Sequence, residues 1–279
     1  MRARVLLATA LGVALALAPL GAQWPVAPDK KLPLKADGTP NLEAPAPRTA
    51  DGKPDLTGVW LNEWFYGGQV RQPPAARPGE PPPSTFANIG THFPKGLPLQ
   101  PWAAKLLAER KEWNSKDNPD AFCLPMGIMQ FHEHPQPRKI IQTPDVLVIL
   151  YEGNAGVRQI FTDGRALPAN DPQPWWYGYS VGRWEGDTLV VRSNGFRDGG
   201  WLDIDGSPMT DAATVTERFR RLNYGTLKID VTIDDPKAYT TPFTVRVNQK
   251  LMVDERLDAE LIEFICQENE RDVKHMVGK

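Results

Sequence analysis

Hydrophobic and polar residues alternate along much of the chain beyond residue 139, which is typical of β-strands that bury one face. The clearest case is 227–233, where aliphatic residues take every second position between polar ones. Residues 146–152 are apolar on both faces, so we expect them in the middle of a sheet. The pattern predicts single strands at 56–65, 139–143, 146–152, 157–162, 214–221, 227–233, 243–253 and 261–267.

Residues 175–192 are expected to form two further strands that are joined by a turn at 185–187. Because side chains alternate along a strand, the first of these strands has one bulky, aromatic face and one face that is small in its centre. Another group can approach the backbone closely over the small face. The bulky face carries Trp175, Tyr177, Tyr179, Val181 and Arg183, and the other carries Trp176, Gly178, Ser180, Gly182 and Trp184.

One helix is predicted, at residues 101–113. Pro101 suits the first turn of a helix. Trp102, Leu106 and Trp113 fall at helical spacing and form an apolar stripe that is expected to pack on the sheet. Helical crossovers between the strands are missing, so we expect an antiparallel meander. A long meander closes into a barrel because closure removes exposed edges, and a two-sheet sandwich is the alternative.

The first 22 residues have the features of a secretory signal peptide. Arg2 and Arg4 precede an apolar run that is too short for a stable membrane span, and Ala22 suits cleavage before Gln23. We therefore expect an exported protein that is periplasmic or secreted. Residues 23–54, rich in Pro, Lys, Asp and Gly, are expected to form an extended, partly disordered arm. The remainder, 55–279, is expected to be a single barrel domain with a Pro-rich loop at 71–83.

The net charge limits the kinds of partner to expect, and the cysteine count allows one disulfide. The chain has a formal charge of −2, and removal of the signal peptide makes it more negative, which argues against nucleic acid or an anionic membrane as the main partner. Cys123 and Cys266 are the two cysteines, enough for one disulfide in an oxidising compartment, with two buried thiols as the alternative. Closing so long a loop is worth about 4–5 kcal/mol in the chain-entropy model.

Four stretches stand out together as sequence motifs. They are residues 51–60 (DGKPDLTGVW), 158–165 (RQIFTDGR), 178–191 (GYSVGRWEGDTLVV) and 233–239 (IDDPKAY). Together they resemble a family of exported bacterial proteins of unassigned function, over roughly residues 50–279. This resemblance implies no catalytic residues.

A second resemblance concerns Gly58-Val59-Trp60 on the first strand after the arm. It is similar to the G-x-W motif of calycins, the lipocalin-like barrels, in which the Trp packs across the closed end. The resemblance implies a cavity for a small, largely apolar ligand. The long stretch 66–138 between the first two strands departs from the standard lipocalin topology.

Three polar residues interrupt otherwise apolar strand faces: Glu217, Gln249 and Glu263. A polar group that is buried without a partner costs on the order of 1–3 kcal/mol, so we expect these side chains to be paired, with Arg158, Arg183 or Arg218 or with tyrosine hydroxyls. They are either structural pairs inside the barrel or part of a ligand site. If two carboxylates converge, one can act as an acid or base, which makes Glu217 and Glu263 the catalytic candidates. The ligand-binding candidates are Trp60, Tyr151, Arg158, Tyr177, Tyr179, Arg183 and Gln249.

Two further motifs are candidates for chemistry. Residues 178–182 match G-x-S-x-G, but no helix is expected to follow Ser180, so a strand with small residues on one face is the favoured interpretation. His132 and His134 would point to the same side of a strand and could share a metal ion; the alternative is two surface histidines in a Pro-flanked loop. We expect no cofactor.

The sequence thus predicts an exported β-barrel that binds a small apolar or aromatic molecule in its interior. The alternatives are an enzyme of lyase, isomerase or hydratase type that uses buried carboxylates, and a structural barrel filled by its own side chains. The nine Trp residues agree with an aromatic ligand site but also suit a protein core.

Overall fold

The computed structural model describes residues 32–67, 76, 78–169, 175–253 and 260–266. The signal peptide expected at 1–22, with its cleavage near Ala22, lies outside the described residues. So do residues 23–31 of the arm and residues 71–75 and 77 of the Pro-rich loop. The described residues from Pro33 onward belong to one compact unit.

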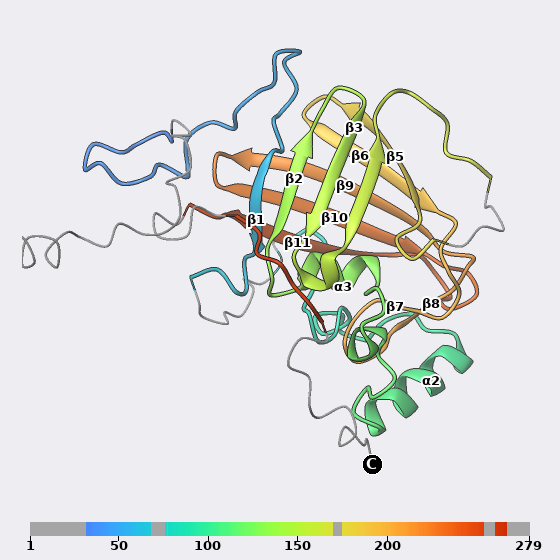
Figure 1. Cartoon of the computed structure of the whole chain (residues 1–279). Coiled ribbons are helices and arrows are strands. Elements are labelled where there is room, and N and C mark those ends of the chain that lie inside the picture. The colour runs from blue at the N-terminus through green and yellow to red at the C-terminus, as the bar shows by residue number, and fades with distance from the viewer. Residues whose placement is uncertain (1–31, 68–75, 77, 170–174, 254–259, 267–279) are drawn as a thin grey trace, which may run out of the picture. The chain divides into compact units, whose positions relative to one another are not determined.

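Nine strands form a closed barrel in the order β1-β11-β10-β9-β6-β5-β4-β3-β2 (Figure 1). The predicted mainly β fold and its closure into a barrel are thus confirmed. β1 closes the barrel, because it pairs with β2 on one side and with β11 on the other. The strands are β1 Gly58–Asn62, β2 Arg138–Gln142, β3 Val146–Tyr151, β4 Val157–Phe161, β5 Tyr179–Glu185, β6 Thr188–Asn194, β9 Thr214–Asn223, β10 Thr226–Asp234 and β11 Phe243–Leu251.

The pairing of β4 with β5 departs from the predicted antiparallel meander. It is parallel and joins only two residue pairs, Ile160 with Ser180 and Phe161 with Val181. A parallel pair needs a connection that returns to the starting end of the sheet, so a two-residue hairpin turn cannot join β4 to β5. The remaining neighbouring strands of the barrel are antiparallel.

Most predicted strands are present with shifted ends, and two predictions need a larger correction. The first of the two strands predicted within 175–192 begins at Tyr179 rather than at residue 175. Gly178 has a φ of +67°, which breaks the extended course of the backbone. The hairpin turn itself lies where it was expected. The strand predicted at 261–267 is wrong over its described residues 261–266, which have no strand partner. Residue 267 lies outside the described residues.

Helices account for little of the described chain. The predicted helix is present as α2, Pro101–Glu112. Its buried residue is Ala103, whereas Trp102 and Trp113 are exposed, so the expected apolar stripe does not pack on the sheet. Arg110 of α2 lies over the Trp201 ring. The sequence did not predict α3, Ile128–Glu133, nor the 3-10 turns η1, Pro119–Phe122, and η2, Gly153–Ala155. A separate two-stranded sheet joins β7, Gly200–Trp201, to β8, Pro208–Met209.

Cys123 and Cys266 form the predicted disulfide, with their Cα atoms 5.7 Å apart. The bond joins η1 to the segment that follows β11. Among the described residues, no helix is both long enough and apolar enough to cross a membrane.

Trp60 and Arg221 pack against each other near the end of the barrel where β1 begins and β9 ends. Trp60 is fully buried, and its indole N–H donates to the Leu56 carbonyl oxygen at 3.0 Å. The Arg221 guanidinium lies 4.9 Å from the centre of the Trp60 ring. Residues 33–54 also pack at this end, where the amide of Tyr224 donates to the carbonyl oxygen of Ala44 at 2.7 Å. The described part of the predicted arm therefore contains turns and contacts the barrel.

Candidate functional site

Helix α3 lies beside the ends of the barrel strands (Figure 1). Polar side chains from three neighbouring strands hold it there. The carbonyl oxygen of His132, at the end of this helix, accepts hydrogen bonds from Asn62 of β1, Arg138 of β2 and Gln249 of β11, at 3.2, 2.6 and 2.8 Å. The last carbonyls of a helix have no partner within it, so these bonds satisfy a group that would otherwise be buried unpaired. Gln249, predicted to bind ligand, thus anchors α3.

Glu217 lies at the centre of a second polar cluster inside the barrel. It is fully buried on β9, as its place on an apolar strand face predicted. The Arg158 guanidinium of β4 donates to both carboxylate oxygens, with an Nη1–Oε1 distance of 2.8 Å. His132 Nε2 lies 2.6 Å from the same Oε1. The expected partner Arg158 is confirmed, whereas Arg183 is exposed and Arg218 pairs with Glu185 on the surface.

The cluster keeps its carboxylate ionised and its imidazole neutral. Burial opposes ionisation of Glu217, but the charge and hydrogen bonds of Arg158, with the bond from His132, lower its pKa to about 2. Burial lowers the pKa of His132 despite the adjacent carboxylate. A neutral His132 beside an ionised carboxylate must carry its proton on Nε2. Its Nδ1 is then a free acceptor, and it has no hydrogen-bond partner among the described residues.

Two serines complete the cluster on the side of β5 and β6. Ser180 Oγ accepts from Arg158 Nε and Nη2 at 3.3 and 3.1 Å, and Ser193 Oγ accepts from Nη2 at 3.1 Å. The two hydroxyl oxygens lie 2.8 Å apart. Ser180, the second residue of β5, therefore faces an arginine from β4, as the small face of this strand allowed. This contact is unlike the turn between strand and helix that exposes a nucleophilic serine in hydrolases.

A pocket of about 300 Å³ opens in the barrel wall where β4 and β5 diverge. Only Ile160 and Phe161 of β4 pair with β5, so residues 157–159 and 175–179 separate on the side that precedes these pairs. Arg158 and Ser180 line this pocket. The polar cluster around Glu217 therefore reaches the wall of the barrel at this point.

Aromatic rings form most of the remaining lining of this pocket, which we call the β4–β5 pocket. Phe161 and Tyr179 stack with their ring centres 5.3 Å apart. Tyr177 packs edge-on against Phe131 of α3 at 5.1 Å, and its burial raises the pKa of its hydroxyl, which therefore stays protonated. The predicted ligand-binding residues Tyr177, Tyr179 and Arg158 are thus brought together. The lining residues are Val157, Arg158, Gln159, Phe161, Trp175, Trp176, Tyr177, Gly178, Tyr179 and Ser180.

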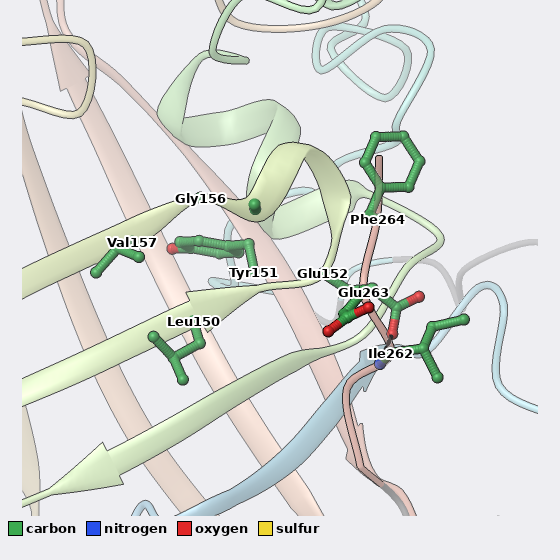
Figure 2. Close-up of a pocket in the computed structure, with 9 residues that line it drawn as sticks. Leu150, Tyr151, Glu152, Gly156, Val157, Ile262, Glu263 and Phe264 are labelled. Atoms are coloured by element: carbon green, nitrogen blue, oxygen red, sulfur yellow. Dashed lines mark hydrogen bonds between the residues drawn. The ribbon is translucent and has the colours of Figure 1, made fainter. Parts of the chain in front are cut away.

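Tyr151 lies between the β4–β5 pocket and a second pocket. Its ring stacks on Phe131 at 4.2 Å. Its hydroxyl is buried close enough to Arg158 for each group to affect the pKa of the other, but no atom lies in hydrogen-bond geometry with it among the described residues. Figure 2 shows the second pocket, of about 210 Å³, and in it the Tyr151 hydroxyl points away from the carboxylates of Glu152 and Glu263.

Glu263 lies on the outside of the barrel. It is exposed on the segment that follows β11, where it lines the second pocket opposite Glu152. The amide of Ile262 donates to the Glu152 carboxylate at 3.0 Å, which places this segment beside the end of β3. The expected convergence of Glu263 with Glu217 inside the barrel does not occur, because residues 261–266 do not continue the sheet.

The two histidines considered as metal ligands do not share a site. His132 and Glu133 belong to α3, not to a strand, and all three residues 132–134 are buried. His132 faces Glu217, while the His134 ring packs edge-on against Phe86 at 5.2 Å. Within the described ranges, no group of three or more His, Cys, Asp or Glu side chains could hold a metal ion. The two interpretations of this pair, a metal site and a surface loop, are both corrected.

Several residues of the site were not predicted from the sequence. The pattern pointed to His132 only as a metal ligand, and Ser193 had no motif to mark it. Ser180 and Trp176 were assigned to the small face, but not to a ligand site. One sequence signal could have pointed to these residues. Strand alternation puts Glu217 inside the barrel, and a buried carboxylate requires hydrogen-bonding partners.

Comparisons with known proteins gave no match: no family model, no curated protein and no solved structure is similar to this chain. The resemblances to an exported bacterial family and to calycins therefore remain predictions.

Proposed function

We propose that this protein binds a small, largely apolar and aromatic molecule in the β4–β5 pocket. The observation that carries the proposal is the meeting of an aromatic lining with a buried polar cluster where the barrel wall opens. Pockets that hold small ligands combine an apolar wall with a few fixed polar groups. The ligand was first expected in the barrel interior; the pocket offers a site in the wall instead.

Binding is favoured over catalysis by the state of the polar cluster. Glu217 is ionised and accepts hydrogen bonds from Arg158 and His132, so at neutral pH it is a poor proton acceptor. The free Nδ1 of His132 is the better base, but His132 is absent from the linings of both described pockets. Catalysis by Glu217 or Glu263 stays a prediction.

Fluorescence titration with N-phenyl-1-naphthylamine, an uncharged aromatic probe, tests the proposed binding. We expect saturable binding to the mature protein and about 5- to 10-fold weaker binding to Trp176→Ala, because one ring of the pocket wall is lost. Trp113→Ala is the matched control, since Trp113 is exposed at the end of α2 and lies outside the pocket. Equal affinity of Trp176→Ala and the wild type would contradict the proposed site.

We also propose that the protein is exported. The signal-peptide features of residues 1–22 support this, and so does the disulfide between Cys123 and Cys266, because disulfides persist in oxidising compartments. Expression of the full chain in a bacterial host, followed by mass spectrometry of the periplasmic fraction, should give a mature protein that begins at Gln23. Retention of the uncleaved chain in the cytoplasm would contradict export.

A further inference from the structure

The charge inside the β4–β5 pocket is already compensated. Arg158 is the one charged side chain among the described residues that line it. Both carboxylate oxygens of Glu217 take hydrogen bonds from this guanidinium, and both side chains are buried. A ligand anion would therefore lose its hydration without gaining a free cation, and such a loss is costly in a buried site.

Two further arginines of the described residues lie over rings of the pocket, and each is paired or solvated. Arg165 lies over the Phe161 ring, but Asp163 neutralises its guanidinium through a salt bridge. Arg197 lies over the Trp176 ring and is exposed, so water and salt screen its attraction for an anion.

The serine pair offers one hydrogen-bond donor that has no acceptor among the described residues. Arginine can only donate, so the Ser180 and Ser193 oxygens both act as acceptors toward Arg158. The two hydroxyls have one hydrogen each, and one of these hydrogens lies in the bond between them. The other has no acceptor within reach in the described part of the chain. Ser180 lines the pocket and Ser193 does not. When the Ser193 hydroxyl donates to Ser180, the Ser180 hydrogen is the one left for an acceptor on a ligand.

We propose that the ligand of the β4–β5 pocket is an uncharged aromatic molecule with a hydrogen-bond acceptor, such as an aryl ketone, which accepts from the Ser180 hydroxyl. This inference rests on the proposed binding function and names its ligand class. Trp176, Tyr177 and Tyr179 contact the flat apolar body, and Ser180 selects the acceptor. The Arg158–Glu217 pair orients the serines and rejects anions.

Three probes of nearly equal shape separate charge from hydrogen bonding. They are 2-acetylnaphthalene, an uncharged acceptor; 2-naphthoate, an anion at pH 7; and 2-isopropenylnaphthalene, which replaces the carbonyl by an alkene. Titration of the mature protein, followed by quenching of Trp fluorescence, should show that the ketone binds most tightly. We expect the alkene to bind about 5-fold more weakly, because one hydrogen bond is missing, and the anion at least about 10-fold more weakly, because its desolvation is not offset.

Two variants connect the preference to named groups. In Ser180→Ala the ketone should lose its advantage over the alkene, while in Ser84→Ala, a buried serine outside the pocket lining, the advantage should remain. In Glu217→Gln the uncompensated Arg158 should improve binding of the anion relative to the ketone. Should Glu217→Gln fail to fold, the comparison of probes in the wild type and in Ser180→Ala still decides.

Each result bears on the proposal. Equal binding of naphthoate and ketone by the wild type would overturn the exclusion of anions. Equal binding of ketone and alkene would overturn the role of Ser180. If none of the three probes binds, the proposed binding function itself fails, and the inference fails with it.

Discussion

At the scale of single residues, Glu217 decides the character of the barrel interior. Its carboxylate is held by Arg158 and His132, which come from β4 and α3, so one buried charge connects three elements. A buried ion pair adds little net stability compared with apolar residues, but loss of one partner leaves the other charge unpaired. The cluster therefore fixes geometry more than it adds stability.

Glu217→Gln should lower the free energy of unfolding by about 3–5 kcal/mol, because it leaves the Arg158 charge buried without a counter-charge. Urea denaturation at pH 7 measures this change. The matched control is Glu185→Gln, which breaks an exposed pair with Arg218 and should cost about 0–1 kcal/mol. Similar losses in the two variants would contradict a special role for the buried pair.

The pH dependence of unfolding provides a second test of Glu217. Its folded-state pKa of about 2 is below the ordinary value of 4.5, so the unfolded state binds the proton first on acidification. The stabilisation is complete above pH 4.5 and is lost as the pH falls toward 2. The difference in stability between wild type and Glu217→Gln should therefore shrink over this interval in urea titrations at stepped pH.

Glu133 should have the opposite pH dependence. Burial raises its pKa from 4.5 to about 7, even though Asn62 donates to its carboxylate at 2.6 Å. The folded state then holds the proton more tightly, so this group's contribution is complete below pH 4.5 and is lost as the pH rises through 7. Glu133→Gln should stabilise the protein relative to wild type at pH 8 but not at pH 4.5, as measured by urea denaturation. An equal effect at both pH values would contradict the raised pKa.

Strand alternation was enough to predict the interior position of Glu217 and Gln249, because a strand puts every second side chain on the same face. It failed for Glu263, since 261–266 has a similar alternation but no neighbouring strand to pair with among the described residues. The partner of Glu217 could be narrowed to a few arginines only, because the sequence does not tell which strands are adjacent. Only the closed barrel shows that Arg158 is the arginine that reaches Glu217.

At the scale of elements, α3 is a helix that the sequence pattern does not predict. It has six residues, all buried, and therefore shows no alternation of polar and apolar faces. Its polar residues are typical of a loop, and Pro135 and Pro137, which follow shortly after it, favour the same interpretation. Tertiary contacts stabilise this short helix, as the three hydrogen bonds to the His132 carbonyl oxygen show.

The start of α3 depends on Gly127. A Cβ atom at this position would lie 1.8 Å from the Trp201 carbonyl oxygen, which is backbone and cannot rotate away. Gly127→Ala should therefore force α3 and β7 apart and destabilise the protein by about 3 kcal/mol or more. Thermal denaturation measures the loss. Gly164→Ala is the control: it has a φ of +89° and open space, so it should cost only the backbone strain of about 1–2 kcal/mol.

At the scale of the whole molecule, the disulfide encloses most of the barrel. The covalent loop from Cys123 to Cys266 contains every barrel strand except β1. It also holds the segment 260–266 beside β3 and so forms one wall of the second pocket.

A double variant with Cys123→Ser and Cys266→Ser should lose about 2–5 kcal/mol of stability, because the unfolded chain is no longer constrained. Guanidinium denaturation under oxidising conditions measures the loss, and the wild type with a reductant should approach the variant. Probe binding at the β4–β5 pocket should be retained at temperatures where the variant is folded, since neither cysteine lines it. Unchanged stability would contradict a structural role for the bond.

The same bond has a consequence for the order in which the protein folds. Most neighbouring strands of the barrel are close in sequence and can pair early, but closure must bring Trp60 on β1 to Leu251 on β11. Until that happens, β1 and β11 are open edges, available to other chains. Once Cys123 and Cys266 are joined, the path along the chain between Trp60 and Leu251 is shortened by more than half. Oxidation before closure thus lowers the entropic barrier to the final pairing and shortens the time for which the unclosed barrel can aggregate.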